Sequence, residues 1–313
     1  MNDRRRPIRT GPPAALAMAL CLAGCSETPH PIGPPERMDA PAGRAYEVVL
    51  ERPIPVGRRF RLRSTGAIDE RLSAGGQAVP GETVRAAFVF ESEVEALKVN
   101  RAGLPQKVRH KVMRLEITEN GRTRSPVAPG KVISAEDPDG AERSILLEGE
   151  AVEGKLERIL RFAIQVQDDK AMSITRACAP DGPQKVGDGW KPDAAGLIAG
   201  FRSPVPLRIE KEDVAAAAEL EGLYRVGGTP CMNVSIEIRF ARFSAAEGSI
   251  KAAGRAEALI RILLPLDEKL PSVGGSMNTE YHVEVEQVEG GRTIRYVFDA
   301  RRRKEVLFLP LAD

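Results

Sequence analysis

Apolar and polar residues alternate along most of the chain from Tyr46 onward. In the stretch Thr83–Val99, the even-numbered positions are mostly apolar, with Phe88 and Phe90 as the largest side chains. Several of the positions between them are charged. A period of two over such a length is typical of an antiparallel strand with one buried face. The alternation therefore predicts long strands, each half-buried.

Pairs of turn residues separate these alternating stretches. Asn and Gly readily adopt the left-handed backbone that two-residue hairpin turns require, so each pair predicts a hairpin. The three pairs are Asn120-Gly121, between 113–118 and 122–127; Gly227-Gly228, between 214–226 and 232–243; and Gly290-Gly291, between 281–285 and 294–298.

One stretch departs from this pattern. Between Gly154 and Asp168, apolar residues recur at intervals of three and four, which predicts a short amphipathic helix. The segment 252–264 fits both periods, and we predict a strand because its neighbours are hairpins. The predicted fold is mainly β, of the α+β class: long antiparallel hairpins form a curved sheet or half-barrel with one short amphipathic helix.

A segment rich in glycine, proline and small residues, 182–204, separates two β-rich regions. We expect it to connect an N-terminal half, 46–181, with a C-terminal half, 205–313. One continuous domain that contains both halves is an equal alternative. The apolar row of the first half includes Met113, Leu115 and Ile117.

The first 24 residues have the composition of an export signal. Four arginines precede an apolar stretch, 14–23, which is shorter than the roughly 20 residues that a membrane-spanning helix requires. The stretch ends in Leu22-Ala23-Gly24-Cys25, which resembles the lipobox of bacterial lipoproteins. The resemblance implies that the signal 1–24 is removed and that Cys25 is acylated, with membrane lipid as its partner.

The residues that follow Cys25 are predicted to form a flexible tether. Five prolines occur before Gly43, with few large apolar side chains, so the segment 25–45 cannot pack and should be extended. Ser26 favours the outer membrane, by analogy with lipoprotein sorting in bacteria that have two membranes. The predicted location is the cell envelope, with the protein facing the periplasm.

Charge and aromatic content argue against one class of partner. The signal contains four arginines and one aspartate, so the remaining chain has 42 basic and 43 acidic residues. Near-neutral, interspersed charge creates no field that gathers nucleic acid, and 4% aromatic residues offer few stacking platforms. We therefore expect no nucleic-acid partner.

Two further cysteines, Cys178 and Cys231, remain in the exported chain. An exported protein folds in an oxidising compartment, where two such cysteines can form a disulfide. The alternative is two separate buried thiols.

The segment Lys185-Val186-Gly187-Asp188-Gly189-Trp190 resembles a family of uncharacterised bacterial lipoproteins that share a Lys-Val-Gly-Asp-x-Trp segment, a lipobox and a later Phe-Pro-Val-Asp-like turn. The turn here is Leu264-Pro265-Leu266-Asp267. The resemblance covers residues 58–313, supports the strands and transfers no catalytic residue. At the level of the fold alone, the chain is also similar to LolA and LolB, half-barrel carriers of the periplasm. Trp190 either plugs the end of the sheet or lines the mouth of a ligand site.

The sequence shows no set of residues with catalytic spacing. Nucleophile motifs and phosphate-binding glycine loops are missing, and no histidine pair has zinc-ligand spacing. His30 lies in the tether and His110 between basic residues, whereas His282 lies on a charged strand face with Glu280 and Glu284. We predict no catalytic residue, metal site or cofactor; a loose cation site at His282 is the alternative to a solvated face.

The densest basic cluster is Arg301-Arg302-Arg303-Lys304, just before the apolar Val306–Leu309. It either protects a terminal strand from edge-to-edge association or meets anionic lipid headgroups or an acidic partner.

These observations favour a non-enzymatic, lipid-anchored envelope protein with a structural or binding role. Two apolar rows, Phe88 with Phe90 and Ile236 with Ile238 and Phe240, either pack as a core or line a concave face that holds an amphiphile. An envelope protein is the other candidate partner. The alternative function is an envelope hydrolase or transferase whose site is assembled from scattered residues.

Overall fold

The computed structural model describes residues 35–138, 143–167, 174–201, 207–247, 250–289 and 292–309. The predicted signal, Cys25, His30 and the Gly290-Gly291 turn lie outside these residues. Within the described ranges, no helix combines the length and the apolar character needed to cross a membrane.

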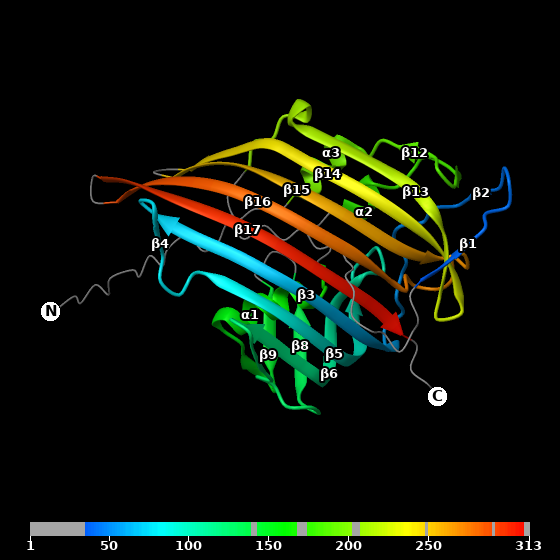
Figure 1. Ribbon diagram of the computed structural model, residues 1–313, viewed down its shortest axis with the longest axis horizontal. Helices are drawn as coiled ribbons and strands as arrows, with labels where there is room; N and C mark the ends of the chain where they lie inside the picture. Colours follow the sequence, from blue (N-terminus) through cyan, green and yellow to red (C-terminus); the bar gives the residue numbers. More distant parts are fainter. Residues whose placement is uncertain are drawn as a thin grey trace.

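Strands dominate the structure, as the alternating sequence predicts (Figure 1). The long strands are β3 (Arg59–Ala74), β5 (Val84–Val99), β6 (Pro105–Glu119), β13 (Val214–Val226), β14 (Thr229–Glu247), β15 (Ile250–Pro265), β16 (Gly274–Glu289) and β17 (Arg292–Leu309). The short strands are β1 (Glu36–Met38), β2 (Ala45–Tyr46), β4 (Gln77–Ala78), β7 (Arg122–Arg124), β8 (Val132–Glu136), β9 (Ser144–Leu147), β10 (Glu150–Ala151), β11 (Gln184–Lys185) and β12 (Gly189–Trp190).

Almost all of these strands form one open antiparallel sheet. Its order is β1-β13-β14-β15-β16-β17-β3-β5-β6-β8-β9-β10, with β4, β7 and β12 paired beside this path, while β2 and β11 form a separate pair. Strands of the two predicted halves share the sheet, because β17 pairs with β3 from Tyr296 opposite Ala74 to Leu309 opposite Arg61.

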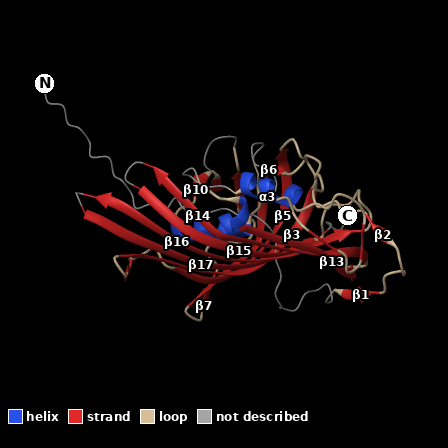
Figure 2. Ribbon diagram, turned by 90° about the horizontal axis from the view of Figure 1, so that it is seen from above, coloured by secondary structure: helices blue, strands red, loops and turns tan. Residues whose placement is uncertain are grey.

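The sheet is curved, and the helices lie on its concave side (Figure 2). We call the helix-covered side the inner face and the opposite side the outer face. The helices are α1 (Gly154–Ala163), α2 (Ile174–Ala177), α3 (Ala194–Gly200) and a single 3-10 turn, η2 (Lys211–Asp213). The predicted fold class, a curved sheet of long antiparallel hairpins with little helix, is confirmed.

Two helical segments were not expected from the sequence. The predicted helix is α1, which ends at Ala163, before the predicted boundary. α2 and α3 are additional, and α3 lies in the segment predicted to be a connector. Asp193 caps α3 by accepting hydrogen bonds from the backbone N–H groups of Ala195 and Gly196, both at 3.0 Å, which is a standard N-cap geometry.

A β-bulge corrects the predicted face of Met113. Glu91 lies opposite Arg114 and Ser92 lies opposite Val112, so Met113 has no partner on β5. An extra residue of this kind bends a strand and shifts its alternation. Val112 therefore takes the buried position before Leu115 in the apolar row, and Met113 is only partly buried.

The paired structure also begins earlier than predicted. Glu36–Met38 forms β1 and pairs with β13, from Glu36 opposite Arg225 to Met38 opposite Leu223. The segment 36–38, assigned to the tether from its proline content, is thus the edge of the sheet. Backbone pairing needs no large side chain, which explains why composition gave no sign of it.

Candidate functional site

The two apolar rows lie in the hydrophobic core on the inner face. Phe88, Phe90, Ile236, Ile238 and Phe240 are each at most 3% exposed. Aromatic side chains from the helical layer pack against them. Phe162 of α1 contacts Phe88 edge-to-face, with ring centroids 6.1 Å apart, and the ring centroids of Phe201 and Phe240 are 4.4 Å apart. The helices and their connections thus cover these rows.

The segment that carries the lipoprotein resemblance forms a structural turn. The carboxylate of Asp188 accepts a hydrogen bond from the backbone N–H of Lys185 at 2.8 Å. Trp190, in β12, is partly buried, and its indole N–H donates to the carbonyl oxygen of Cys178 at 2.8 Å. Because β12 pairs with β13, the Trp190 contact joins the α2 region to β13.

The two cysteines are free thiols in the structure. Cys178 and Cys231 are both buried and unbridged, which corresponds to the alternative of two separate thiols rather than a disulfide. Burial raises the pKa of Cys178 to about 12 and that of Cys231 to about 11. Both side chains therefore stay protonated at neutral pH and react slowly.

Arg52, which no sequence pattern singled out, stabilises the turn that follows β15. Its guanidinium group donates to the carbonyl oxygens of Asp267 at 2.8 Å, Pro265 at 3.0 Å and Leu270 at 3.0 Å. Arg52 is only 4% exposed, and burial lowers its pKa. The Leu264-Pro265-Leu266-Asp267 turn is thus held by a buried cation.

A cluster of charged residues joins α1 to the inner face of the sheet. The carboxylate of Glu70 accepts a hydrogen bond from Arg302 Nε at 2.6 Å and lies 3.9 Å from Arg158 of α1. Lys304 donates to the carbonyl oxygen of Phe162 at 2.6 Å, and its ammonium group lies 5.1 Å from the centre of that ring. We call Glu70, Arg158, Arg302 and Lys304 the inner charged cluster.

The position of β17 corrects the edge-protection interpretation of the basic segment 301–304. β17 lies in the middle of the sheet, between β16 and β3, so it has no free edge to protect. Alternation divides the segment between the two faces. Arg302 and Lys304 belong to the inner charged cluster, whereas Arg301 and Arg303 point to the outer face.

His110 is a buried histidine with one hydrogen bond. Ser92 Oγ and His110 Nδ1 lie 2.9 Å apart, and Nε2 has no hydrogen-bond partner in the part of the chain that the structure describes. Ser92 is fully buried and His110 is 2% exposed, so this serine–histidine pair is closed to substrate. Burial lowers the pKa of His110 to about 3.

We expect His110 to make the protein sensitive to acid. The histidine takes up a proton near pH 6.5 in the unfolded chain but only near pH 3 in the folded chain, so stability is lost as the pH falls from 6.5 toward 3. Between about pH 7.5 and about pH 5, the wild-type chain should lose about 2 kcal/mol more unfolding free energy than His110→Leu. Urea denaturation at the two pH values measures this difference, and Ser92→Ala is the control that retains the histidine. Equal losses in wild type and His110→Leu would contradict the assignment.

His282 is paired with carboxylates on the outer face. Its Nδ1 lies 2.8 Å from Asp299 and its Nε2 lies 3.3 Å from Glu284, whereas Glu280 pairs with Arg301 at 3.4 Å. The three residues of the suggested cation site therefore do not converge. Among the described residues, no group of His, Cys, Asp and Glu has the geometry to hold a metal ion.

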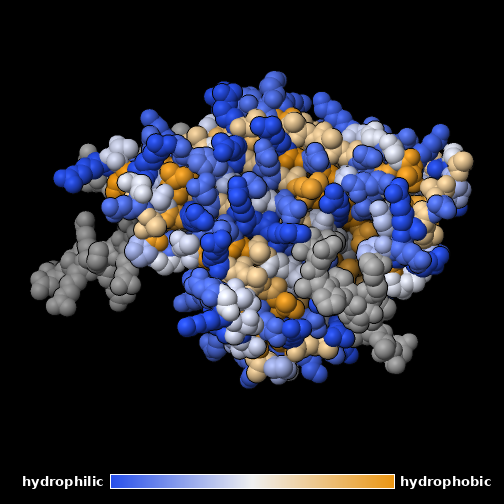
Figure 3. All heavy atoms as spheres, viewed as in Figure 1, coloured by the Kyte–Doolittle hydropathy of each residue, from blue (hydrophilic) through white to orange (hydrophobic). Residues whose placement is uncertain are grey.

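The outer face is predominantly hydrophilic (Figure 3), and it contains a depression of about 810 Å³ across β6, β5, β3, β17 and β16. Its floor includes the small side chains of Ala67 and Ala87. The β6–β7 turn contributes Asn120 and Gly121, both with positive φ, at 50° and 75°. This is the predicted Asn-Gly hairpin turn, and β7 projects beyond the outer face (Figure 2).

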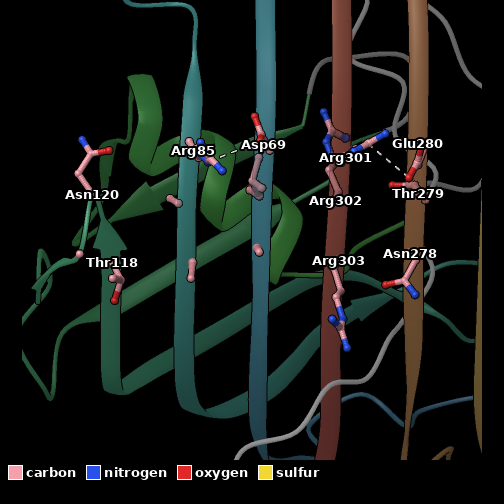
Figure 4. Close-up of a pocket in the computed structure, with 15 residues that line it drawn as sticks. Asp69, Arg85, Thr118, Asn120, Asn278, Thr279, Glu280, Arg301, Arg302 and Arg303 are labelled. Carbon is pink, nitrogen blue, oxygen red and sulfur yellow. Dashed lines mark ion pairs between the residues drawn. The ribbon is translucent and has the colours of Figure 1, made fainter.

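Two rows of side chains cross the depression (Figure 4). In the first row, the strand register places Arg85, Asp69, Arg301 and Glu280 on four adjacent strands. The second row, two residues further along each strand, is Thr118, Ala87, Ala67, Arg303 and Asn278. Guanidinium, carboxylate, amide and hydroxyl groups thus surround a floor of methyl groups. The sequence pattern singled out Arg301, Arg303 and Glu280 in separate contexts but did not bring them together, because the pairing of strands far apart in the chain cannot be read from it.

Comparison with protein-family models and with curated proteins finds no match for the chain. The resemblance to bacterial lipoproteins and to periplasmic half-barrel carriers therefore stays a prediction.

Proposed function

We propose that the chain is a lipid-anchored lipoprotein of the cell envelope that acts as a non-enzymatic binding module. The lipobox-like segment before Cys25 supports the anchor, and Ser26 favours the outer membrane, with the folded part in the periplasm. The observation that carries the binding role is the arrangement of the two faces. The apolar inner rows are packed in the core, and the outer face has a depression lined by polar groups.

The packed inner face favours binding at the outer face over an amphiphile carrier. A carrier needs apolar side chains that line space for an acyl chain. Phe90 and Ile236 have no exposed surface, and aromatic rings of the helical layer cover the neighbouring Phe88 and Phe240. The depression instead presents hydrogen-bond donors and charged groups, and such groups orient a polar ligand.

Expression in a bacterium with two membranes, with an alkyne-tagged fatty acid in the medium, tests this proposal. We expect wild type to be labelled and membrane-bound, and Cys25→Ala to be unlabelled. In parallel, residues 26–313, which contain every described element, are exported to the periplasm and weighed by native mass spectrometry. We expect no bound mass in the acyl-chain range.

Two outcomes would contradict the proposal. Label that persists in Cys25→Ala would show that the acyl group is attached to another residue. A bound mass of acyl-chain size that disappears on denaturation would favour the carrier function instead.

A further inference from the structure

We infer that one end of the sheet rests on the lipid bilayer, with exposed apolar side chains of its loops inserted at the level of the headgroups. This inference rests on the proposed acyl anchor at Cys25 and goes beyond it, because it assigns a second membrane contact to the folded part. It is carried by the place where the chain enters the sheet, by the short connection from Cys25 and by the position of the exposed apolar residues.

The chain enters the sheet at one particular end. Glu36, the first residue of β1, lies opposite Arg225, next to the β13–β14 turn, and Met38 lies opposite Leu223, further along β13. The strand register places the β15–β16 turn, the end of β17, the start of β3 and the β5–β6 turn at the same end. We call this end the anchor rim; it lies at the right of Figure 1.

The connection from the proposed anchor to the sheet is short. Because pairing begins at Glu36, only the residues 26–35 separate Cys25 from the sheet. These residues span about 35 Å when fully extended and roughly 17 Å as a flexible chain. β3 contains 16 residues, which corresponds to a strand about 50 Å long. An acyl group on Cys25 therefore keeps the anchor rim near the bilayer and leaves the opposite end of the sheet free to point away from it.

Exposed apolar residues occur mainly at the anchor rim. In the part of the chain that the structure describes, the exposed large apolar residues are Val49, Val56, Leu270 and Val288. Leu270 lies in the β15–β16 turn and Val56 in the turn that precedes β3, whereas Val288 lies at the opposite end of β16. Single exposed apolar residues are common on protein surfaces. What sets these apart is that they lie at the end that the anchor approaches.

Arg52 places Val49 at this end as well. Its guanidinium group donates to the carbonyl oxygen of Val49 at 3.1 Å and to that of Leu270 at 3.0 Å. The same buried cation thus holds both exposed side chains at the β15–β16 turn. Because their backbone is already fixed by these hydrogen bonds, contact with lipid does not have to order it.

Val56 is held at the rim by the neighbouring strand. The backbone N–H of Gly57 donates to the carbonyl oxygen of Ala96 in β5 at 2.8 Å. Val56 itself is 59% exposed. At the same rim, Phe60 of β3 and Phe308 of β17 pack edge-to-face with ring centroids 5.4 Å apart, and both are partly exposed. The rim therefore presents apolar side chains from several adjacent strands.

The charges beside these residues have both signs. Glu268 and Lys269 directly precede Leu270, and Arg59, at the start of β3, lies 3.5 Å from Glu93. Mixed charges create no strong field toward anionic lipid. Contact with the bilayer therefore depends on the apolar side chains, which enter the boundary between headgroups and acyl chains.

This orientation leaves the outer-face depression accessible. Asp69, which lines the depression, follows the start of β3 at Arg59 by about 30 Å along the strand. A polar ligand can therefore reach the depression from water while the anchor rim contacts lipid.

Fluorescence quenching by lipid tests the inference on the full-length protein, purified from bacterial membranes and reconstituted in phosphatidylcholine vesicles. Val56→Cys, Leu270→Cys and Val288→Cys each carry a nitrobenzoxadiazole dye. We expect the dye at positions 56 and 270 to lose at least about half of its emission to lipid that is spin-labelled just below the headgroup, the depth that interfacial apolar groups reach. The dye at position 288 is the matched control, an exposed valine replaced in the same way, and should keep its emission.

The native thiols do not interfere with this labelling. Cys178 and Cys231 are buried, and burial raises the pKa of both, so they react slowly with the dye. Wild type measures the remaining background.

A second substitution tests whether the apolar side chains make the contact. In the labelled Leu270→Cys protein, Val56→Asp should reduce quenching, because a carboxylate is unfavourable at this depth. Val288→Asp is its control and should leave quenching unchanged. Adding phosphatidylglycerol to the vesicles should also leave quenching unchanged.

Intact mass, measured first, separates failure of the anchor from failure of the rim contact. Protein without an acyl group on Cys25 would contradict the proposed anchor, and the inference with it. Acylated protein that is quenched equally at all three positions, or at none, would overturn the inference alone. Emission at positions 56 and 270 that shifts to the blue without quenching would show that a second copy of the chain covers the rim, and quenching only with phosphatidylglycerol would show attraction by charge. Either result would also overturn the inference.

Discussion

Replacing Phe88 with alanine is expected to lower the free energy of unfolding by about 3–5 kcal/mol, the range found when a buried phenylalanine is truncated. Phe88 is 3% exposed. Its ring packs edge-to-face on Phe162 of α1 and lies over Gly66, where an added Cβ would come within 2.8 Å of the ring. Removing the ring therefore leaves a cavity between α1 and the sheet. The cavity closes only if one of the two moves.

Ile238→Ala, in the other half of the sheet, tests the same point. Ile238 is 2% exposed, and we expect a loss of about 2–5 kcal/mol. Guanidinium denaturation followed by circular dichroism measures both variants. Val89→Ala is the control for Phe88, because Val89 is the next residue on β5, points to the outer face and is only partly buried. Its loss should be clearly smaller.

These variants distinguish inner rows that form a packed core from inner rows that line a ligand site. Core residues lose stability on truncation, whereas residues that line a cavity lose ligand with little change in unfolding. If Phe88→Ala and Ile238→Ala unfold as wild type does, the inner rows do not form the core, and the amphiphile-carrier function becomes the better explanation.

The alternation of apolar residues predicted the strands well because it reports burial directly. In β5, β14 and β15, one face packs on the core, so the period of two survives in the sequence. The segment 252–264, which fits both periods, is indeed the strand β15. The prediction failed at Met113 because a bulge shifts the alternation by one residue. The position of a bulge depends on how two strands pair, and a single sequence does not reveal that pairing.

The helices α2 and α3 were missed for a different reason. They are short, so they span too few turns for an apolar period to stand out. Asp193 before the run of small residues is the one available signal for α3. The strand β1 could not be predicted from composition either, because its backbone pairing with β13 needs no particular side chain.

The candidate site was least predictable, since it depends on register between distant segments. Asp69 and Arg301 are directly opposite one another on β3 and β17, although they are far apart in sequence. The basic segment 301–304 was visible in the sequence, but its division into two outward and two inward residues follows from the place of β17 in the sheet.

Replacing Glu70 with glutamine is expected to lower the free energy of unfolding by about 3–5 kcal/mol, the cost of leaving a buried charge without its partner. Glu70 is 4% exposed and accepts a hydrogen bond from Arg302 Nε at 2.6 Å. The Arg302 guanidinium lies 5.6 Å from the centre of the Tyr281 ring, and only 14% of that side chain is exposed. Water therefore replaces the lost carboxylate only in part.

A double-mutant cycle with Glu70→Gln and Arg302→Met measures the coupling by urea denaturation. We expect the double variant to be more stable than the sum of the single losses predicts, by about 1–3 kcal/mol, because it no longer contains a buried, unpaired charge. The exposed pair Arg239–Glu257, tested with Glu257→Gln, is the control and should show no measurable loss. Strict additivity would mean that the inner charged cluster does not act as a unit. In that case α1 is held to the sheet by its apolar contacts, with Phe162 against Phe88 as the main one.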